Sequence, residues 1–283
     1  MSTDNVRLDA HHHLWDLDVR PQGWTKEFPV LDRSFRMDDL APLLQANEIG
    51  GTILVETINV GPETGEFLAL AAQDPTIRGV VGWVDLTASD VADRLAELRA
   101  LPGGDHLVAV RHQVQLEPDP NWLIREDVLA GLRAVADAGL AFDLLVLPHQ
   151  LPAAIEATRR VDHMNWVLDH AAKPPIASGE LQPWQSLITE LAGEPSVTCK
   201  LSGLVTEASD AWSIAQIRPY AEWVFEAFGP DRVMFGSDWP VALLRASYHE
   251  VVALTEELVA PLSAGEQAAI WGGAAMRAYR LSD

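Results

Sequence analysis

Short runs of alternating apolar and polar residues recur along the whole chain. The first run places Val6, Leu8 and Ala10 between polar neighbours and leads into the histidines of residues 11–13. Side chains two residues apart on a strand share a face, so this period predicts a β-strand with one buried side. Similar runs predict seven further strands, at Thr52–Thr57, Gly79–Asp85, Leu107–His112, Ala141–Leu147, Met164–His170, Ser196–Ser202 and Arg232–Asp238.

Between the strands the apolar residues recur every three or four positions, which is typical of amphipathic helices. Met37, Leu40 and Leu44 follow this period, and the pair Gly50-Gly51 then ends the helix. Residues 17–34 show no period and are expected to form a long loop. The predicted helices cover Arg36–Ile49, Glu63–Gln73, Asp90–Ala100, Glu126–Ala138, Leu151–Arg160, Pro183–Leu191, Ile214–Phe228, Ala246–Leu258 and Gly265–Tyr279.

Strands and helices therefore alternate from end to end, which favours parallel strands joined by helices. Eight such units in roughly 250 residues match the count of an α/β protein with a (β/α)₈ barrel. An open doubly wound sheet would offer a glycine-rich first turn, whereas the first turn here is rich in histidine. No repeat or low-complexity linker divides the chain, so we expect one domain over residues 1–283.

The charge balance narrows the classes of partner. The net charge is −21, which disfavours binding to nucleic acid or to an anionic membrane surface. Cys199 is the single cysteine, so no internal disulfide forms. The first nine residues lack the pattern of a secretory leader, and no apolar run approaches about 20 residues. We expect a cytoplasmic enzyme or binding protein.

The histidines after the first strand are the first candidates for chemistry. His11 and His13 are two apart and are expected to point the same way, with His12 opposite. Two imidazoles at one strand end are half of a metal site or a hydrogen-bonding cradle for a polarised substrate.

Polar residues also follow the other predicted strands, at the end where (β/α)₈ barrels carry their active sites. Each has a structural reading too: Asp169 suits a turn cap, Glu56 an ion pair, and Lys200 a buried salt bridge. Buried polar groups cost free energy unless they are partnered, so their convergence favours a functional site. The candidates are Glu56, Asp85, Arg111, His112, His149, Asp169, His170, Lys200, Ser202 and Asp238.

Four motifs resemble those of the amidohydrolase superfamily. They are His11-x-His13, residues 169–175 (DHAAKPP), residues 200–204 (KLSGL) and residues 236–240 (GSDWP). The chain is most similar to the amidohydrolase-related branch, which includes lactonases of the L-fuconolactonase, L-rhamnonolactonase and 2-pyrone-4,6-dicarboxylate lactonase types. The resemblance covers nearly the whole chain and is less specific to a substrate than to the branch.

The resemblance implies a distorted (β/α)₈ barrel that catalyses hydrolysis. It gives Asp238 the role of general base on the attacking water. His11, His13 and His170 match the histidines that bind a divalent metal or hold water and the scissile carbonyl. Arg111 would steady the carbonyl oxygen or a carboxylate with its fork of donors.

One departure from the wider superfamily concerns the metal. The fourth strand ends in Arg111 rather than in a lysine suited to carbamylation, and Lys200 lies on the seventh strand. A carbamate-bridged pair of metals is therefore disfavoured. His11, His13, His170 and Asp238 suit one divalent ion, Zn²⁺ first, with a water position open. Hydrolysis without metal stays an alternative.

A second group of residues is predicted to bind the substrate. His149 lies in the loop after the fifth strand, and Lys173 suits a substrate carboxylate or a pair with Asp169. Tryptophans near the strand ends suit stacking on a sugar, although many tryptophans only pack. Cys199 is expected to be a buried apolar residue. The substrate-binding set is His112, His149, Lys173, Trp24, Trp239 and Ser202.

The prediction is a hydrolase that opens a small-molecule lactone, first a sugar-acid (aldono) lactone, by water activated by Asp238. One alternative is a Zn²⁺-dependent hydrolase of another ester or amide, or a decarboxylase. Another is a non-catalytic protein that binds a metabolite in the same pocket. A homodimer is compatible with the sequence, which does not decide the oligomeric state.

Overall fold

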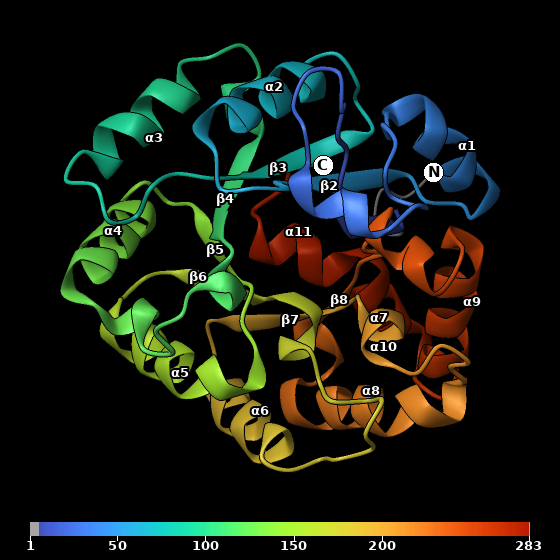
Figure 1. The fold of residues 1–283 in the computed structure, drawn as a ribbon. Helices are drawn as coiled ribbons and strands as arrows, with labels where there is room; N and C mark the ends of the chain where they lie inside the picture. Colours follow the sequence, from blue (N-terminus) through green and yellow to red (C-terminus); the bar gives the residue numbers. More distant parts are fainter. Residues whose placement is uncertain (1–5, 283) are drawn as a thin grey trace.

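The computed structural model describes residues 6–282 and consists of eight parallel strands arranged in the order of the chain, from β1 to β8. Figure 1 shows them inside a ring of helices. This is the predicted (β/α)₈ barrel. The strands are β1 (Leu8–His12), β2 (Gly51–Val55), β3 (Ile77–Gly82), β4 (Leu107–His112), β5 (Ala141–Leu144), β6 (Asn165–Leu168), β7 (Val197–Leu201) and β8 (Val233–Phe235).

The helices lie where the apolar period predicts them, mostly to within one to three residues. Short turns of 3₁₀ helix fill several loops, including Gly23–Glu27 in the long loop after β1. The α-helices are α1 (Met37–Ala46), α2 (Gly61–Ala71), α3 (Val91–Arg99), α4 (Glu126–Asp137), α5 (Leu151–Arg160), α6 (Trp184–Ala192), α7 (Leu204–Glu207), α8 (Ile214–Phe228), α9 (Tyr248–Val259), α10 (Ala264–Ala268) and α11 (Ala274–Ala278).

The last predicted helix is where the structure departs most from the apolar period. A capping box from Ser263 to Glu266 begins α10 as expected. The continuous helix predicted over Gly265–Tyr279 is interrupted by a π-helical turn at Ala269–Gly273. That turn holds two adjacent glycines, which weaken an α-helix. The chain enters α11 only after it.

After this interruption, the end of the chain closes the N-terminal end of the barrel. In Figure 1, α11 lies inside the ring of outer helices. Ala274, Ala278 and Tyr279 pack with the inward-facing strand residues in one buried cluster. Asn165, the first residue of β6, donates from Nδ2 to the carbonyl of Ala278 at 3.0 Å. The N-terminal end of the barrel is therefore filled, and ligands reach the interior from the opposite end.

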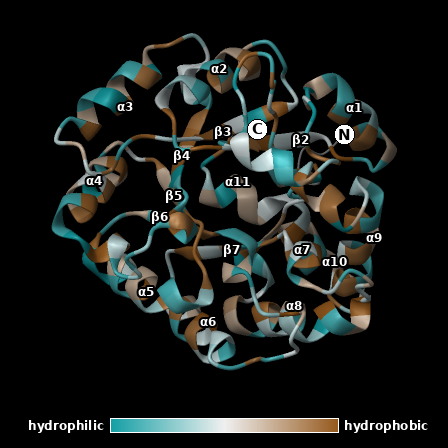
Figure 2. Cartoon of the chain, in the orientation of Figure 1, coloured by the Kyte–Doolittle hydropathy of each residue, from teal (hydrophilic) through white to brown (hydrophobic). Residues whose placement is uncertain are grey.

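The outward-facing strand residues form the larger core, between the barrel and the helices. Phe142, Trp166 and Phe235 are fully buried there. Figure 2 shows that the outer helices carry both hydrophobic and hydrophilic residues, as amphipathic helices do. Cys199 also lies in this layer with no exposed surface, as expected for a buried apolar residue.

A buried carboxylate closes the seam between β8 and β1. Asp9 Oδ1 accepts hydrogen bonds from the backbone N–H of Ser237 at 2.8 Å and of His11 at 3.1 Å. Asp9 Oδ2 accepts from the hydroxyl of Tyr248 on α9 at 3.0 Å. The Asp238 backbone N–H in turn donates to the carbonyl of His11 at 2.8 Å. The seam therefore brings the ends of β1 and β8 side by side.

Among residues 6–282, none of the helices is both long enough and apolar enough to cross a bilayer. The absence of a leader pattern concerns residues 1–9, and the first five of these lie outside the described residues.

Candidate active site

A cavity of about 380 Å³ lies at the C-terminal ends of the strands. Its polar lining residues include His13, Arg111, His170, Lys173 and Asp238. Its apolar lining residues are Trp24, Phe28, Ile58, Leu116, Leu145, Val241 and Leu244. Such a mixed lining suits a small ligand that carries both hydroxyl or carbonyl groups and apolar surface.

Asp238 lies among three histidines, of which His13 and His170 line this cavity and His11 is fully buried. His11 Nε2 and His13 Nε2 are 3.1 Å apart. Asp238 Oδ1 lies 3.5 Å from His13 Nε2, 3.8 Å from His11 Nε2 and 3.9 Å from His170 Nε2. The structure thus brings together the four residues that the sequence proposes as metal ligands. We name these four residues the cavity cluster.

The backbone around the cavity cluster is shaped to bring these side chains inward. His170 and Asp238 both adopt left-handed backbone conformations, with φ of 53° and 56°. Each therefore leaves the strand direction at the point where it turns into the cavity. Gly203 and Gly236 pass so close to the imidazoles that a Cβ would lie 2.7 Å from His170 Nδ1 and 2.7 Å from His11 Cβ. This close approach accounts for glycine in both motifs.

Hydrogen bonds on the far ring nitrogens orient the histidines. His13 Nδ1 lies 2.9 Å from the carbonyl of Val55, which fixes the proton on Nδ1 and leaves the Nε2 lone pair toward the cavity. His170 Nδ1 lies 2.8 Å from Ser202 Oγ. Ser202 therefore orients the His170 ring through Nδ1, the ring nitrogen that does not face Asp238.

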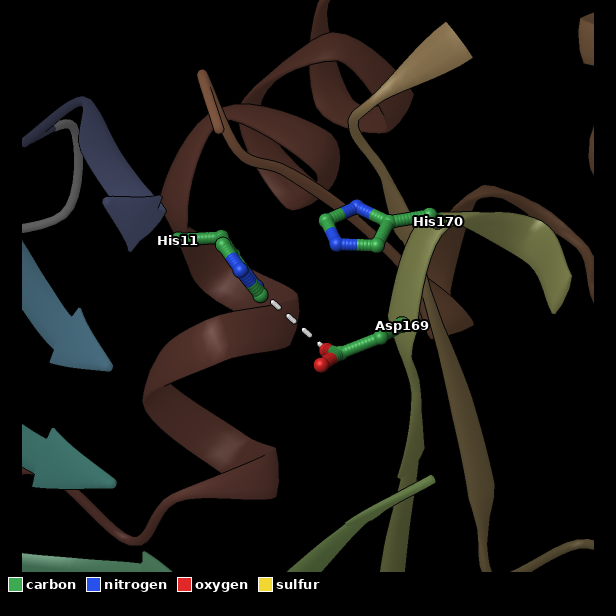
Figure 3. Close-up of side chains that lie close together, drawn as sticks. All are labelled: His11, Asp169 and His170. Atoms are coloured by element: carbon green, nitrogen blue, oxygen red, sulfur yellow. Dashed lines mark ion pairs between the residues drawn. The ribbon is translucent and has the colours of Figure 1, made fainter. Parts of the chain in front are cut away.

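His11 differs from these two because its Nδ1 has two competing neighbours. Asp169 Oδ1 lies 3.3 Å away, a contact drawn as a dashed line in Figure 3, and Lys200 Nζ lies 3.0 Å away. A proton on Nδ1 that is donated to Asp169 frees the Nε2 lone pair for a metal. A bond donated by Lys200 to Nδ1 instead places the proton on Nε2, which then becomes a hydrogen-bond donor in the cavity.

The charges of the cavity cluster follow from burial and from these neighbours. Burial lowers the pKa of His170 to about 4 and the pKa of His11 well below its usual range. Burial raises the pKa of Asp238, but His170, His13 and Lys173 together lower it by more, so this pKa lies below its ordinary value. At neutral pH the site therefore holds an ionised carboxylate beside the neutral imidazoles of His11 and His170.

A second charged group lies directly beneath, between the cavity cluster and α11. Arg111 donates from Nε to Glu56 Oε1 at 2.8 Å and from Nη1 to Asp169 Oδ2 at 2.9 Å. Lys200 Nζ lies 2.6 Å from Asp143 Oδ2 and 2.9 Å from Asp169 Oδ1. We name these five residues the buried charge layer. Lys200 and Glu56 are ion-paired within it, as their structural readings expect, whereas Asp169 is held by Arg111 and Lys200 rather than capping a turn.

Three members of the cavity cluster form a donor set for a single divalent ion. One ligand atom each from His11, His13 and Asp238 lie within 4.8 Å of one another, whereas His170 is grouped in this way with His11 and with Asp169 of the buried charge layer. Ligand atoms around a tetrahedral Zn²⁺ are about 3.3 Å apart, close to the 3.1–3.9 Å spacings found here. The hydrogen bonds of Nδ1 in His13 and His170 also leave both Nε2 atoms on the side of Asp238. The residues therefore fit Zn²⁺.

Two of the predicted substrate-binding residues line the cavity. Trp24 is one of its apolar lining residues, and Lys173 is one of its polar lining residues. Lys173 Nζ is 3.8 Å from Glu207 Oε1, so its ion-pair partner is Glu207 rather than Asp169.

The other four lie outside the cavity lining. His112 stacks on Trp122 with ring centroids 4.2 Å apart and bonds Glu117 at 2.7 Å, because strand alternation turns it away from the side of Arg111. Trp239 is 2% exposed and packs edge-on against Phe35. His149 is exposed in a 3₁₀ turn after β5, and Ser202 supports His170 as described.

The structure also shows residues that the sequence did not single out. Asp143 is fully buried beneath Lys200, and Glu63 is buried at the start of α2. Gln113 lines the cavity and donates from Nε2 to the carbonyl of Thr57 at 2.7 Å. The position of Asp143 two residues beyond Ala141, on an inward face, is a signal that alternation could have given.

Comparisons with known proteins agree with this arrangement. A family model described as Amidohydrolase matches residues 8–281. The L-fucono-1,5-lactonase of Burkholderia multivorans is 39% identical over 291 residues, which cover 98% of this chain and 97% of that protein. The L-fucono-1,5-lactonase of Burkholderia ambifaria is 35% identical over 97% of this chain and 96% of that protein.

A solved structure extends the comparison to three dimensions. A crystal structure of an amidohydrolase from Burkholderia multivorans with bound zinc superposes with a TM-score of 0.92 at 39% identity. The match covers 98% of this chain and the whole of the other chain.

Proposed function

The chain belongs to the amidohydrolase family, and we propose that it opens the ring of a sugar-acid (aldono) lactone with a water molecule activated by Asp238. The observation that carries this proposal is the position of the Asp238 carboxylate. It faces the cavity, and His11, His13 and His170 surround it at 3.5–3.9 Å. An ionised carboxylate held in this way can take a proton from water at neutral pH.

The reaction needs one proton acceptor and one group for the developing oxyanion. The water oxygen bonds to the lactone carbonyl carbon while Asp238 takes the proton. The bond from that carbon to the ring oxygen then breaks, and the proton returns to the ring oxygen as a hydroxyl. His170 holds the water by a hydrogen bond within the cavity.

Arg111 is placed to steady the carbonyl oxygen. A guanidinium carries five N–H donors. Three of them reach Glu56 Oε1, Asp169 Oδ2 and the carbonyl of Glu56, and a fourth, on Nη1, lies 3.4 Å from His11 Nε2, so one remains. Arg111 also lines the cavity, which allows the remaining donor to meet the substrate.

His11, His13, His170 and Asp238 would hold a divalent metal, Zn²⁺ first. When bound, such an ion supplies Lewis acidity to the carbonyl or lowers the pKa of water. The hydrogen-bonding roles of Asp238 and Arg111 do not depend on it, so hydrolysis without metal stays within the proposal.

The relatives and the mixture of polar and apolar residues that line the cavity support this substrate class. The Burkholderia relatives are L-fucono-1,5-lactonases. Lys173 and Gln113 offer polar contacts for sugar hydroxyls, while Trp24 and Val241 offer an apolar surface. A neutral sugar lactone with one apolar edge fits this pairing.

The test is to incubate the protein with a panel of aldonolactones, with and without a chelator. Ring opening is measured by the acid that it releases. Wild-type protein should open at least one sugar lactone well above its spontaneous rate. Asp238→Asn should lower kcat about 10³-fold, because a general base contributes about 10²–10⁴-fold. Near-normal turnover by this variant, with the protein folded, contradicts the mechanism.

A further inference from the structure

One wall of the cavity is held by a pair of buried residues that touch neither the cavity cluster nor the buried charge layer. Resting on the proposed lactone site, we propose that Gln22 and Glu63 are positioning residues that set the orientation of Trp24 and Thr57 toward the substrate. Gln22 and Glu63 are each only 2% exposed. Trp24 and Thr57 both line the cavity.

Glu63 anchors Thr57 at the end of β2. Its Oε2 accepts a hydrogen bond from the Thr57 backbone N–H at 2.6 Å, and its Oε1 accepts from the Thr57 hydroxyl. The charge of a carboxylate makes such bonds stronger than neutral ones. Thr57 is thereby held by two bonds at both its backbone and its side chain.

Gln22 links Thr57 to Trp24 through the two ends of its side-chain amide. Its Nε2 donates to Thr57 Oγ1 at 2.6 Å and lies 3.5 Å from Glu63 Oε1. Its Oε1 accepts from the indole N–H of Trp24 at 3.1 Å. The amide of Gln22 therefore has only one orientation that satisfies both ends, and this orientation sets the angle of the indole.

Trp24 depends on this bond because it lies in a loop. It belongs to the 3₁₀ turn Gly23–Glu27 and has no strand partner. Its ring also packs against Trp15 in a T-shaped pair, with centroids 5.4 Å apart. A rigid aromatic face is suited to the apolar side of a sugar ring, where its contribution depends on its angle.

Thr57 also connects Glu63 to Gln113, another residue that lines the cavity. The Thr57 carbonyl accepts from Gln113 Nε2 at 2.7 Å, so Gln113 is turned by the residue that Glu63 holds. None of these contacts reaches Asp238. The pair should therefore affect the binding of the substrate more than the activation of water.

The first test replaces Gln22 with methionine, which has a similar length but no polar group. We expect Gln22→Met to raise KM about fivefold and to leave kcat within about twofold, the loss expected for one buried hydrogen bond. Gln45→Met on the exposed face of α1 is the matched control and should change neither constant. Equal loss of kcat and no change in KM would overturn the proposal.

A second test addresses Glu63 and its neighbour on the same helix. Glu63→Gln should raise KM, because an amide cannot accept all the bonds that the carboxylate accepts. Glu66→Gln is the control, since Glu66 is exposed on α2 and pairs with Arg20 at 2.8 Å. The same KM in both variants would overturn the proposed role of Glu63.

A double-mutant cycle separates positioning from general stability. If Gln22 acts through the indole, Gln22→Met should raise KM less in a Trp24→Phe background than in wild type. Full additivity of the two effects would show that Gln22 does not act through Trp24.

A measurement without substrate distinguishes failure of this inference from failure of the proposed function. In ¹⁵N spectra, the Trp24 indole N–H signal is the one absent from Trp24→Phe. It should shift in Gln22→Met and stay in place in Gln45→Met. An unshifted signal in Gln22→Met overturns the inference, even when no lactone on the panel is opened.

Discussion

Asp238 and Asp143 are both buried aspartates on the barrel, but they meet their surroundings in different ways. Asp143 lies 2.6 Å from Lys200 and also accepts from the hydroxyl of Tyr279 at 2.9 Å. Asp238 faces three imidazoles at 3.5–3.9 Å and one side of an open cavity. The first carboxylate is fully engaged, whereas the second keeps room for water.

The same contrast holds for the two groups as a whole. The buried charge layer is closed by short ion pairs between strands and by α11 beneath it. The spacings within the cavity cluster are those of ligands around a metal ion or of groups that hydrogen-bond to one shared water. Charged residues at strand ends therefore divide into a layer of buried ion pairs, of which Arg111 also lines the cavity, and a cluster at the cavity that we propose contacts the substrate.

The largest expected effect on stability lies in the buried charge layer. Lys200→Met leaves Asp143 without its cation and should lower the free energy of unfolding by about 3–5 kcal/mol. Lys26→Met, at an exposed position, should change it by less than about 0.5 kcal/mol. Chemical denaturation measures both. Equal small losses would mean that the buried layer does not hold the fold.

The cavity cluster should respond to metal where the layer does not. Zn²⁺ at about 100 times its Kd should raise the free energy of unfolding of the wild type by about 2.7 kcal/mol. His13→Ala should remove this gain, and His149→Ala, at an exposed position, should keep it. Thermal melts with and without zinc provide the measurement, and a gain that survives in His13→Ala would place the ion elsewhere.

A smaller effect is expected at the edge of the cavity. Lys173→Met should raise KM about tenfold with little change in kcat, because a charged hydrogen bond to the substrate is worth about 1.5–3 kcal/mol. Glu207→Gln keeps the ammonium in place and should leave KM within about threefold. A KM that does not change in Lys173→Met would place Lys173 outside the substrate contacts.

The smallest effects should come from histidines outside the cavity lining. His112→Phe preserves the stacking on Trp122 and should leave kcat/KM within about threefold of the wild type. His149→Ala should behave in the same way. A drop of a hundredfold in either variant would show that the substrate reaches beyond the cavity described here.

The regular part of this fold could be predicted from the sequence because it depends on local period. Residues 214–228 and 151–160 form helices with the expected bounds, and β4 spans the predicted residues 107–112. The convergence of His11, His13, His170 and Asp238 followed from the barrel, since all eight strands end at one face.

The sequence does not predict the positions of residues that are determined by contacts with residues far away in the chain. His112 follows Arg111 on β4, so alternation turns it outward, which a reading of strand ends alone overlooks. Asp9 lies on the polar side of the first strand, yet it is fully buried, because it closes the seam to Ser237 and Tyr248. Gln22 and Glu63 are 41 residues apart, and only the folded chain shows that they meet.

The most direct test compares Asp238→Asn with Asp143→Asn by measuring kcat and the free energy of unfolding on the same preparations. Asp238→Asn should lose about 10³-fold in kcat and keep its stability. Asp143→Asn should lose about 3 kcal/mol of stability and keep kcat within an order of magnitude at a temperature where it is folded. If Asp238→Asn turns over lactone normally, or if both variants lose the same two quantities equally, the division between cavity cluster and buried charge layer is wrong.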